Sequence, residues 1–168
     1  MNLRQLDSPK LIQTVAEWMS RQENYQWLDF GGGRQILTPE WLKIMTQRPT
    51  EALRVFTADE TEVPIGVVGL TGVNRHFRTA TLWAVLGEKG YARQGYATRA
   101  VSQALTLAFQ VYRLHAVNTW LVEGNHSEHI VRRLHFRLIG RQRECHVLDG
   151  CPRDRLWFDL LASEHEEL

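Results

Sequence analysis

A loop with three glycines and two cations, residues 87–95, is the stretch whose residue types could do chemistry. It follows an apolar run at 80–86 and precedes a helical pattern over 96–112. The first amides of a helix lack intrahelical partners, and the helix dipole makes that end partly positive. Such an end attracts phosphate, and glycine lets the backbone approach an anion closely. We therefore expect phosphate binding where loop and helix join, at Arg93, Gln94, Gly95, Tyr96, Ala97 and Thr98. The alternative is an ordinary strand–turn–helix unit without a ligand.

A covalent nucleophile is not expected. Ser127 has His126 beside it, but adjacent residues of a helix do not face each other, so no Ser–His–acid set forms. Cys145 and Cys151 lie far from the glycine loop in sequence and match neither a zinc site nor a redox motif. His126 and His129 could titrate near neutral pH, but we expect both on the surface of a helix start.

Composition narrows the class of protein. The 168 residues, 43% of them hydrophobic, predict one globular domain over 1–168. A net charge of +1 gives no field that would recruit nucleic acid or a membrane. Residues 1–10 lack the apolar segment of a signal peptide, so we expect a cytoplasmic protein with reduced cysteines and no metal.

The first half predicts two capped helices and three strands. Ser8–Pro9 and Thr38–Pro39 each pair an N-cap with proline at the first helical position, starting helices that end near Gln22 and before Pro49. Alternation at 53–58 and an apolar run at 65–70 predict a hairpin, and 80–86 predicts a third strand.

The second half predicts a crossover and a final hairpin. The helix over 96–112 must join 80–86 to a parallel strand at 115–122, because a crossover of this length returns to the sheet in parallel. Asn125 and Glu128 have the spacing of a capping box and predict a helix over 125–136. Strands at 137–147 and 155–161 follow, joined at Asp149–Gly150, and residues 163–168 are expected to fray. The fold class is therefore α/β, or α+β by some schemes.

The element order and the glycine loop resemble the GNAT family of N-acetyltransferases, and within it the RimJ/RimL branch. The family's loop reads Gln/Arg-x-x-Gly-x-Gly/Ala; Gly95 and Ala97 match it, whereas Ala92 does not. The branch's Gly-Tyr-Ala-Thr stands intact at 95–98, and Ser127 and Phe136 keep a nine-residue interval that is also typical. The resemblance covers about residues 53–161.

The resemblance implies transfer of an acetyl group from acetyl-CoA to a small-molecule or peptide amine. It implies a mostly antiparallel mixed sheet, flanked by helices, whose central parallel strands splay apart. The diphosphate would bind at 93–98, and an open main-chain N–H at Val85, Leu86 or Gly87 would hold the pantetheine and polarise the acetyl oxygen. Asn125 and Ser127 are then expected near the cosubstrate, with Ser127 as proton donor or as an orienting group. A homodimer is one assembly that the family resemblance leaves open.

Two departures remove residues that relatives use, one as a proton donor and one as a base, and no base is evident in the sequence. Relatives carry a Tyr where this chain has Val131, and the branch often carries a Glu where it has Thr81. Glu123 is the nearest carboxylate in sequence, with a solvated surface role as the alternative. An acyl-CoA-binding module with little catalysis therefore stays open beside the enzyme. The acceptor is expected between the N-terminal helices and the sheet, against the aromatic stretch at 24–34, and direct attack of the amine on the thioester is the expected route.

Overall fold

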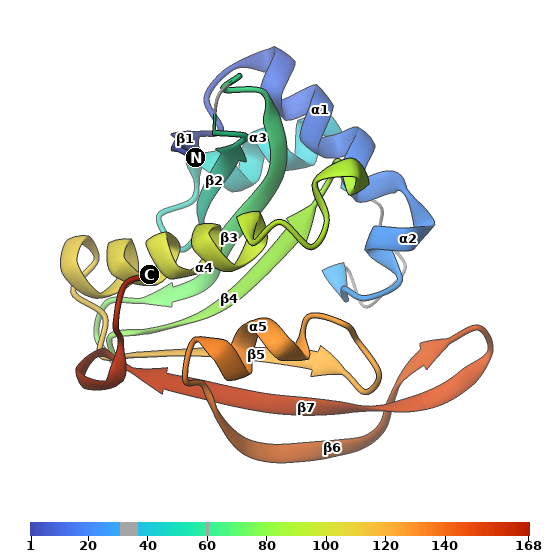
Figure 1. Cartoon of the computed structure of the whole chain (residues 1–168), viewed down its shortest axis with the longest axis vertical. Coiled ribbons are helices and arrows are strands. Elements are labelled where there is room, and N and C mark those ends of the chain that lie inside the picture. The colour runs from blue at the N-terminus through green and yellow to red at the C-terminus, as the bar shows by residue number, and fades with distance from the viewer. Residues whose placement is uncertain (31–36, 60) are drawn as a thin grey trace.

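Seven strands form one mixed sheet in the computed structural model, which describes residues 1–30, 37–59 and 61–168 (Figure 1). Their order is β1-β2-β3-β4-β5-β7-β6. The strands are β1 (Leu3–Gln5), β2 (Ala52–Thr57), β3 (Pro64–Asn74), β4 (Thr79–Leu86), β5 (Ala116–Val122), β6 (Arg137–Leu148) and β7 (Cys151–Leu161). The expected fold class is confirmed: one strand pair is parallel and the others are antiparallel.

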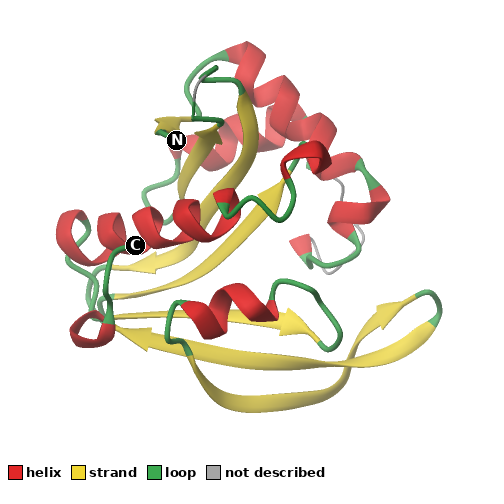
Figure 2. Cartoon of the chain, in the orientation of Figure 1, coloured by secondary structure: helices red, strands yellow, loops and turns green. Residues whose placement is uncertain are grey.

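The parallel pair, β4 and β5, begins together and then parts. Paired positions run from Thr79↔Ala116 to Thr81↔Asn118. One residue further along, the Thr119 hydroxyl donates a buried hydrogen bond of 2.8 Å to the Leu82 carbonyl, so a side chain replaces the main-chain ladder there. Toward their C-terminal ends the two strands diverge (Figure 2). The splay implied by the family resemblance is therefore present.

Helices cover both faces of the sheet. They are α1 (Pro9–Ser20), α2 (Gln22–Tyr25), α3 (Pro39–Gln47), α4 (Tyr96–Thr106) with a π-helical extension at Leu107–Val111, and α5 (Glu128–Arg133). On one face α1 and α3 pack on Val67, Trp83 and Val85 of the sheet. On the other face α4 packs on residues from β3 to β7. Ser8 and Thr38 cap α1 and α3 as expected, accepting from the amides of Leu11 and Trp41.

Two expectations were wrong at this level, and one strand was missed. The helix expected over 125–136 is only α5, because the Asn125 carboxamide accepts from the Ser127 amide and forms a turn in place of a capping box. β1 was missed, since three residues are too few to show a period. Residues 163–168 do not fray: the Leu168 amide donates to the Ser102 hydroxyl at 3.0 Å, so Ser102 is buried under the chain end.

No helix in the described part of the chain is long and apolar enough to cross a membrane. Cys145 and Cys151 are unpaired thiols on the β6–β7 hairpin.

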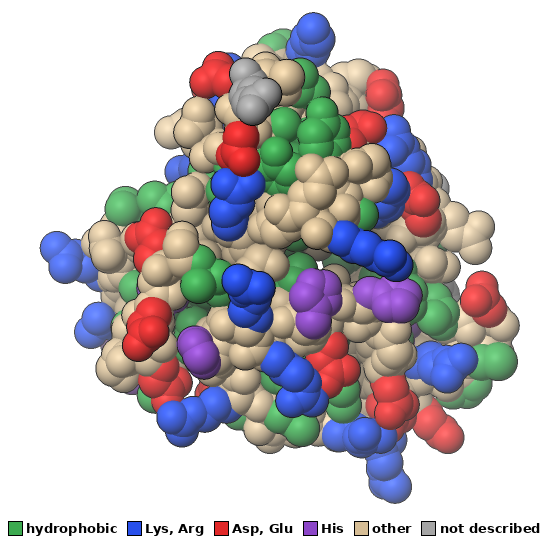
Figure 3. All heavy atoms as spheres, in the orientation of Figure 1, with side chains coloured by type: hydrophobic (Ala, Val, Ile, Leu, Met, Phe, Trp, Pro, Cys, Tyr) green, Lys and Arg blue, Asp and Glu red, His purple; other side chains and the backbone are tan. Residues whose placement is uncertain are grey.

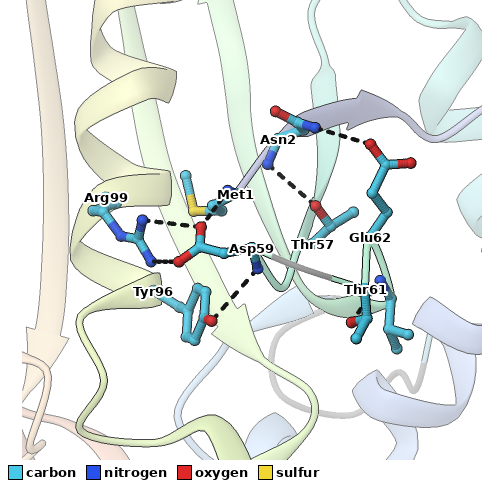
Figure 4. Close-up of polar contacts among 9 residues, drawn as sticks. Met1, Asn2, Thr57, Asp59, Thr61, Glu62, Tyr96 and Arg99 are labelled. Atoms are coloured by element: carbon cyan, nitrogen blue, oxygen red, sulfur yellow. Dashed lines mark hydrogen bonds and ion pairs between the residues drawn. The ribbon is translucent and has the colours of Figure 1, made fainter.

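The start of α4 is fixed by Asp59, in the turn between β2 and β3 (Figure 4). Its carboxylate accepts from both terminal nitrogens of Arg99, at 3.1 and 2.8 Å, and pairs with the amino group of Met1. Its amide donates to the Tyr96 hydroxyl at 3.5 Å, and the Arg99 guanidinium lies over the Tyr96 ring. These hydrogen bonds, those from Arg99 first, hold the pKa of the Asp59 carboxyl far below its usual range.

Asp59→Asn should therefore lower the free energy of unfolding in a pH-dependent way. A carboxyl whose pKa is lower in the folded state stabilises above the pKa of the unfolded chain, ~3.9, and loses this effect as the pH falls through the folded value. The difference in the free energy of unfolding between wild type and variant should be largest at neutral pH and should disappear in strong acid. Urea unfolding across this range, with exposed Asp7→Asn as control, measures it; a gap of constant size would contradict the ion-pair account.

Candidate active site

A cavity of about 360 Å³ follows the opening between β4 and β5. From one side α4 and α5 contribute apolar groups, with Ala97, Val101, Ile130 and Val131 among them. From the other side the segment at and after α2 contributes acidic and aromatic groups, with Glu23, Trp27, Asp29 and Phe30 among them. The strands between supply Thr71, Thr81, Leu82, Trp83, Ala84, Val85, Leu86, Thr119, Trp120 and Leu121. Because its lining comes from both faces of the sheet, the cavity connects them.

The N-terminus of α4 lies beside this cavity and carries a concentration of backbone donors. Gly95 occupies the N-cap position with φ of +80°, a left-handed conformation that favours glycine, and no side chain caps the helix. The amides of the first turn therefore have no intrahelical acceptor. A Cβ on Gly95 would meet no protein atom within 4 Å, so the space in front of the helix is open. Arg93 and Gln94 are exposed there. This end could hold a phosphate group.

Lys, Arg and His side chains gather near the middle of the face drawn in Figure 3, where Figure 1 has the region between β4 and α5. The lysine and arginine side chains among them would attract an anionic ligand to this face.

At the end of β4, one backbone N–H that was expected to be open is already hydrogen-bonded. The amides of Gly87 and Glu88 both donate to the Ile65 carbonyl, at 2.8 and 2.9 Å, and form a bulge. The expectation of an open N–H is therefore wrong for Gly87. Antiparallel ladders alternate, so Val85 also directs its main-chain groups to β3, whereas Ala84 and Leu86 direct theirs to the opening. The Leu82 carbonyl, two residues earlier, already points to Thr119 on that side. Leu86 was expected here and Ala84 was missed.

Helix α1 and the segment before α2 are held against the same bulge. A Cβ on Gly87 would come within 2.1 Å of the Trp18 ring, so only glycine permits this approach. The Trp18 indole donates to the Glu88 carboxylate at 2.6 Å, and Arg21 donates to the Gly87 carbonyl at 2.9 Å. Lys89 donates to the Leu86 carbonyl at 2.7 Å and to the Asn24 side chain, and burial lowers the pKa of Lys89. These contacts fix the position of α2, which forms one wall of the cavity.

The wall opposite the α4 side is aromatic. Phe30 meets Trp83 edge to face, with ring centroids 5.1 Å apart. The Trp83 indole N–H is buried and has no hydrogen-bond partner among the described residues. The Arg155 guanidinium lies 4.0 Å from the Trp120 ring centroid and donates to Asp29 at 2.6 Å. Trp27 and Phe30 are half-buried and line the cavity; residues 31–34 of the segment expected to form the acceptor wall lie outside the described residues.

The remaining candidates divide between the cavity and the surface. Ser127 lines the cavity, and its hydroxyl makes no capping bond to α5. Asn125 and His126 line it as well, whereas His129 is exposed. Glu123 lies outside the lining and pairs with Arg141 at 3.3 Å, which favours its surface role. In the described ranges, no three His, Cys, Asp or Glu side chains are placed to hold a metal ion.

Solved structures with this fold are similar in shape but distant in sequence. A spermidine N-acetyltransferase from Vibrio cholerae, in complex with CoA and spermine, matches with a TM-score of 0.84 and 18% identity, covering 97% of this chain and 96% of that one. A ribosomal-protein-S5-alanine acetyltransferase from Vibrio fischeri matches with a TM-score of 0.78 and 18% identity, covering 98% and 94%. No curated protein sequence matches the chain.

The family model described as acetyltransferase (GNAT) domain matches residues 1–137, which is most of the chain. This match confirms the family resemblance and supports an enzyme over a module that only binds acyl-CoA. The chain belongs to the GNAT family of acetyltransferases, whose members move an acetyl group from acetyl-CoA to an amine.

Proposed function

We propose that this protein acetylates a small amine, with acetyl-CoA on the α4–α5 side of the sheet and the acceptor on the α2 side. The observation that carries the proposal is a cavity lined from both faces, which would let the two substrates meet between β4 and β5. In this scheme residues 1–168 act as one domain, and the protein works in the cytoplasm.

The cosubstrate would be held chiefly by main-chain groups. The diphosphate lies on the amides at 93–98, where the uncapped helix end and Arg93 supply donors and positive charge. The pantetheine arm extends the open edge of β4, and the Ala84 and Leu86 amides point toward it. An amide aimed at the acetyl oxygen stabilises the negative charge that develops there during attack. Asn125 orients the turn before α5 by its bond to the Ser127 amide at 2.8 Å.

Transfer would be direct. Among the described residues that line the cavity there is no cysteine, and His126 is adjacent to Ser127 in sequence, which gives no activated nucleophile. The neutral amine attacks the thioester carbon, the C–S bond breaks, and the departing thiolate takes a proton. The protein supplies proximity, which can contribute roughly 7–11 kcal/mol of barrier reduction.

The acceptor side favours a compact cationic or aromatic amine. Glu23 and Asp29 bring negative charge, and Trp27 and Trp120 bring aromatic surface to the cavity. The neighbours named above are a spermidine acetyltransferase with bound spermine and an acetyltransferase for an alanine of a ribosomal protein, so this fold accommodates both small amines and proteins as acceptors. The intact Gly-Tyr-Ala-Thr at 95–98 supports placing this chain near the RimJ/RimL branch. Small amines are our first choice of acceptor, and peptides are the alternative. A panel of amines and peptides, followed by release of the CoA thiol, decides between them.

Gly95→Glu should weaken binding of CoA by at least tenfold, about 1.4 kcal/mol, because a carboxylate would enter the space in front of α4. Gly150→Glu, in the β6–β7 turn, is the matched control: its φ of +75° is close to the +80° of Gly95, and a Cβ there also meets no atom within 4 Å. Calorimetric titration with CoA measures both variants. Equal affinities in the two would remove the assignment of the diphosphate to α4.

Ser127→Ala should lower kcat about tenfold, or about 1.4 kcal/mol, and leave activity measurable. The reason is that Ser127 would assist the leaving thiolate or orient it, and water can replace that function. Ser163→Ala, in the exposed turn after β7, serves as the control. An acetylated protein detected by mass spectrometry without acceptor, or parallel lines in two-substrate kinetics, would instead establish a covalent route.

A further inference from the structure

A row of polar side chains crosses the sheet where β4 and β5 begin to part. Thr71 of β3 is the cross-strand partner of Thr81 of β4, and Thr81 is the partner of Asn118 of β5. Partners in adjacent strands place their side chains on the same face, here the face of α1 and α3. Both threonines line the cavity, beyond Trp83 on the acceptor side.

Both threonine hydroxyls already donate a hydrogen bond within the protein. Thr71 donates to a carboxylate oxygen of Glu51 at 2.8 Å, and Thr81 donates to the Asn118 side-chain oxygen at 2.7 Å. A hydroxyl has one donor and two acceptor lone pairs, so each oxygen can offer a ligand only lone pairs. This part of the cavity therefore accepts hydrogen bonds and suits a group rich in N–H, such as an amine or its ammonium form.

Glu51, just before β2, stands behind Thr71 and does not itself line the cavity. One of its carboxylate oxygens accepts from Thr71; the other is buried and has no hydrogen-bond partner among the described residues. Burial raises the pKa of Glu51, while the Thr71 hydroxyl, the Gly72 amide and the charge of Arg48 act in the opposite direction. The Arg48 guanidinium lies 5.1 Å from the Trp41 ring centroid. This half-buried carboxylate can gain a proton from Thr71 without losing the hydrogen bond between them, because donor and acceptor then exchange roles.

We infer that Glu51, acting through the Thr71 hydroxyl, takes up the proton that the acceptor amine must lose before it attacks acetyl-CoA. The inference rests on the proposed function, which puts the amine on this side of the cavity. Thr71 would contact the amine, and Glu51 would position and polarise Thr71.

The proton transfers balance as follows. The ammonium gives one proton to the Thr71 oxygen as the Thr71 hydrogen passes to Glu51, so an O–H bond forms on the carboxylate. The neutral amine then forms the N–C bond, and the C–S bond breaks. The second amine proton goes to the CoA thiolate, and Glu51 later returns its proton to water.

Other carboxylates near the cavity are worse placed for this role. Asp29 is paired with Arg155 at 2.6 Å, and Glu23 is exposed at the rim near Lys89. Glu51, by contrast, is joined by a hydrogen bond of 2.8 Å to the Thr71 hydroxyl, which lines the cavity.

Glu51→Gln tests the inference, because glutamine keeps the shape and can still accept from Thr71. At neutral pH its kcat/KM should fall by ~10²-fold, the lower range for general base catalysis. The loss should shrink as the pH rises toward the amine pKa, ~10, where the acceptor is already neutral. Thr71→Val should reproduce this profile, and Thr71→Ser should restore most of the activity. Glu40→Gln, an exposed change at the start of α3, is the matched control.

The readouts separate this role from a structural one. CoA affinity and thermal unfolding of Glu51→Gln should stay close to wild type. A rate loss of the same size at every pH, or no loss, would overturn the role of Glu51 while leaving acetyl transfer intact. Wild-type protein that acetylates no amine of the panel would instead remove the proposed function, and the role of Glu51 with it.

Discussion

The parting of β4 and β5 after Thr81 and Asn118 is the constraint on which the rest of this structure depends. Main-chain groups that leave a ladder must find other partners or face a ligand, since an unpaired buried polar group costs free energy. Thr119 satisfies the Leu82 carbonyl at the apex. Beyond it, Ala84 and Leu86 face the cavity. The same divergence that weakens the sheet leaves an open edge on β4, which in our proposal binds the extended arm of the cosubstrate.

The two sides of that opening are built differently, and our proposed placement of the two substrates follows from this difference. On the α4 side the donors are backbone amides at an uncapped helix end, fixed in place by the contact of Asp59 with Tyr96 and Arg99. Amides and positive charge suit an anionic diphosphate. On the α2 side, aromatic rings and hydroxyl oxygens dominate, which suits an amine. Lys89 joins these sides by bonding Leu86 and Asn24 together.

Much of the fold could be predicted because the signals are local. Ser8–Pro9 and Thr38–Pro39 begin helices, and Asp149–Gly150 turns a hairpin, each through its own backbone preferences. The parallel pair followed from the length of the crossover. What failed depends on contacts distant in sequence. Residues 163–168 were expected to fray, but the Leu168 amide bonds to Ser102 of α4, and Gly87 was expected as an open donor, but its amide bonds to Ile65 in a bulge. Glu51 gave no signal, since its partner Thr71 is 20 residues away and only strand register brings them together.

Amide chemical shifts during titration with CoA test the central claim most directly, because they report each main-chain N–H separately. If the arm of CoA lies along the open edge of β4, the amides of Ala84, Leu86 and residues 95–98 should shift strongly. The Gly87 amide, bonded to Ile65, and the Gly150 turn should shift much less. Saturating CoA that leaves Ala84 and Leu86 unchanged would contradict the account.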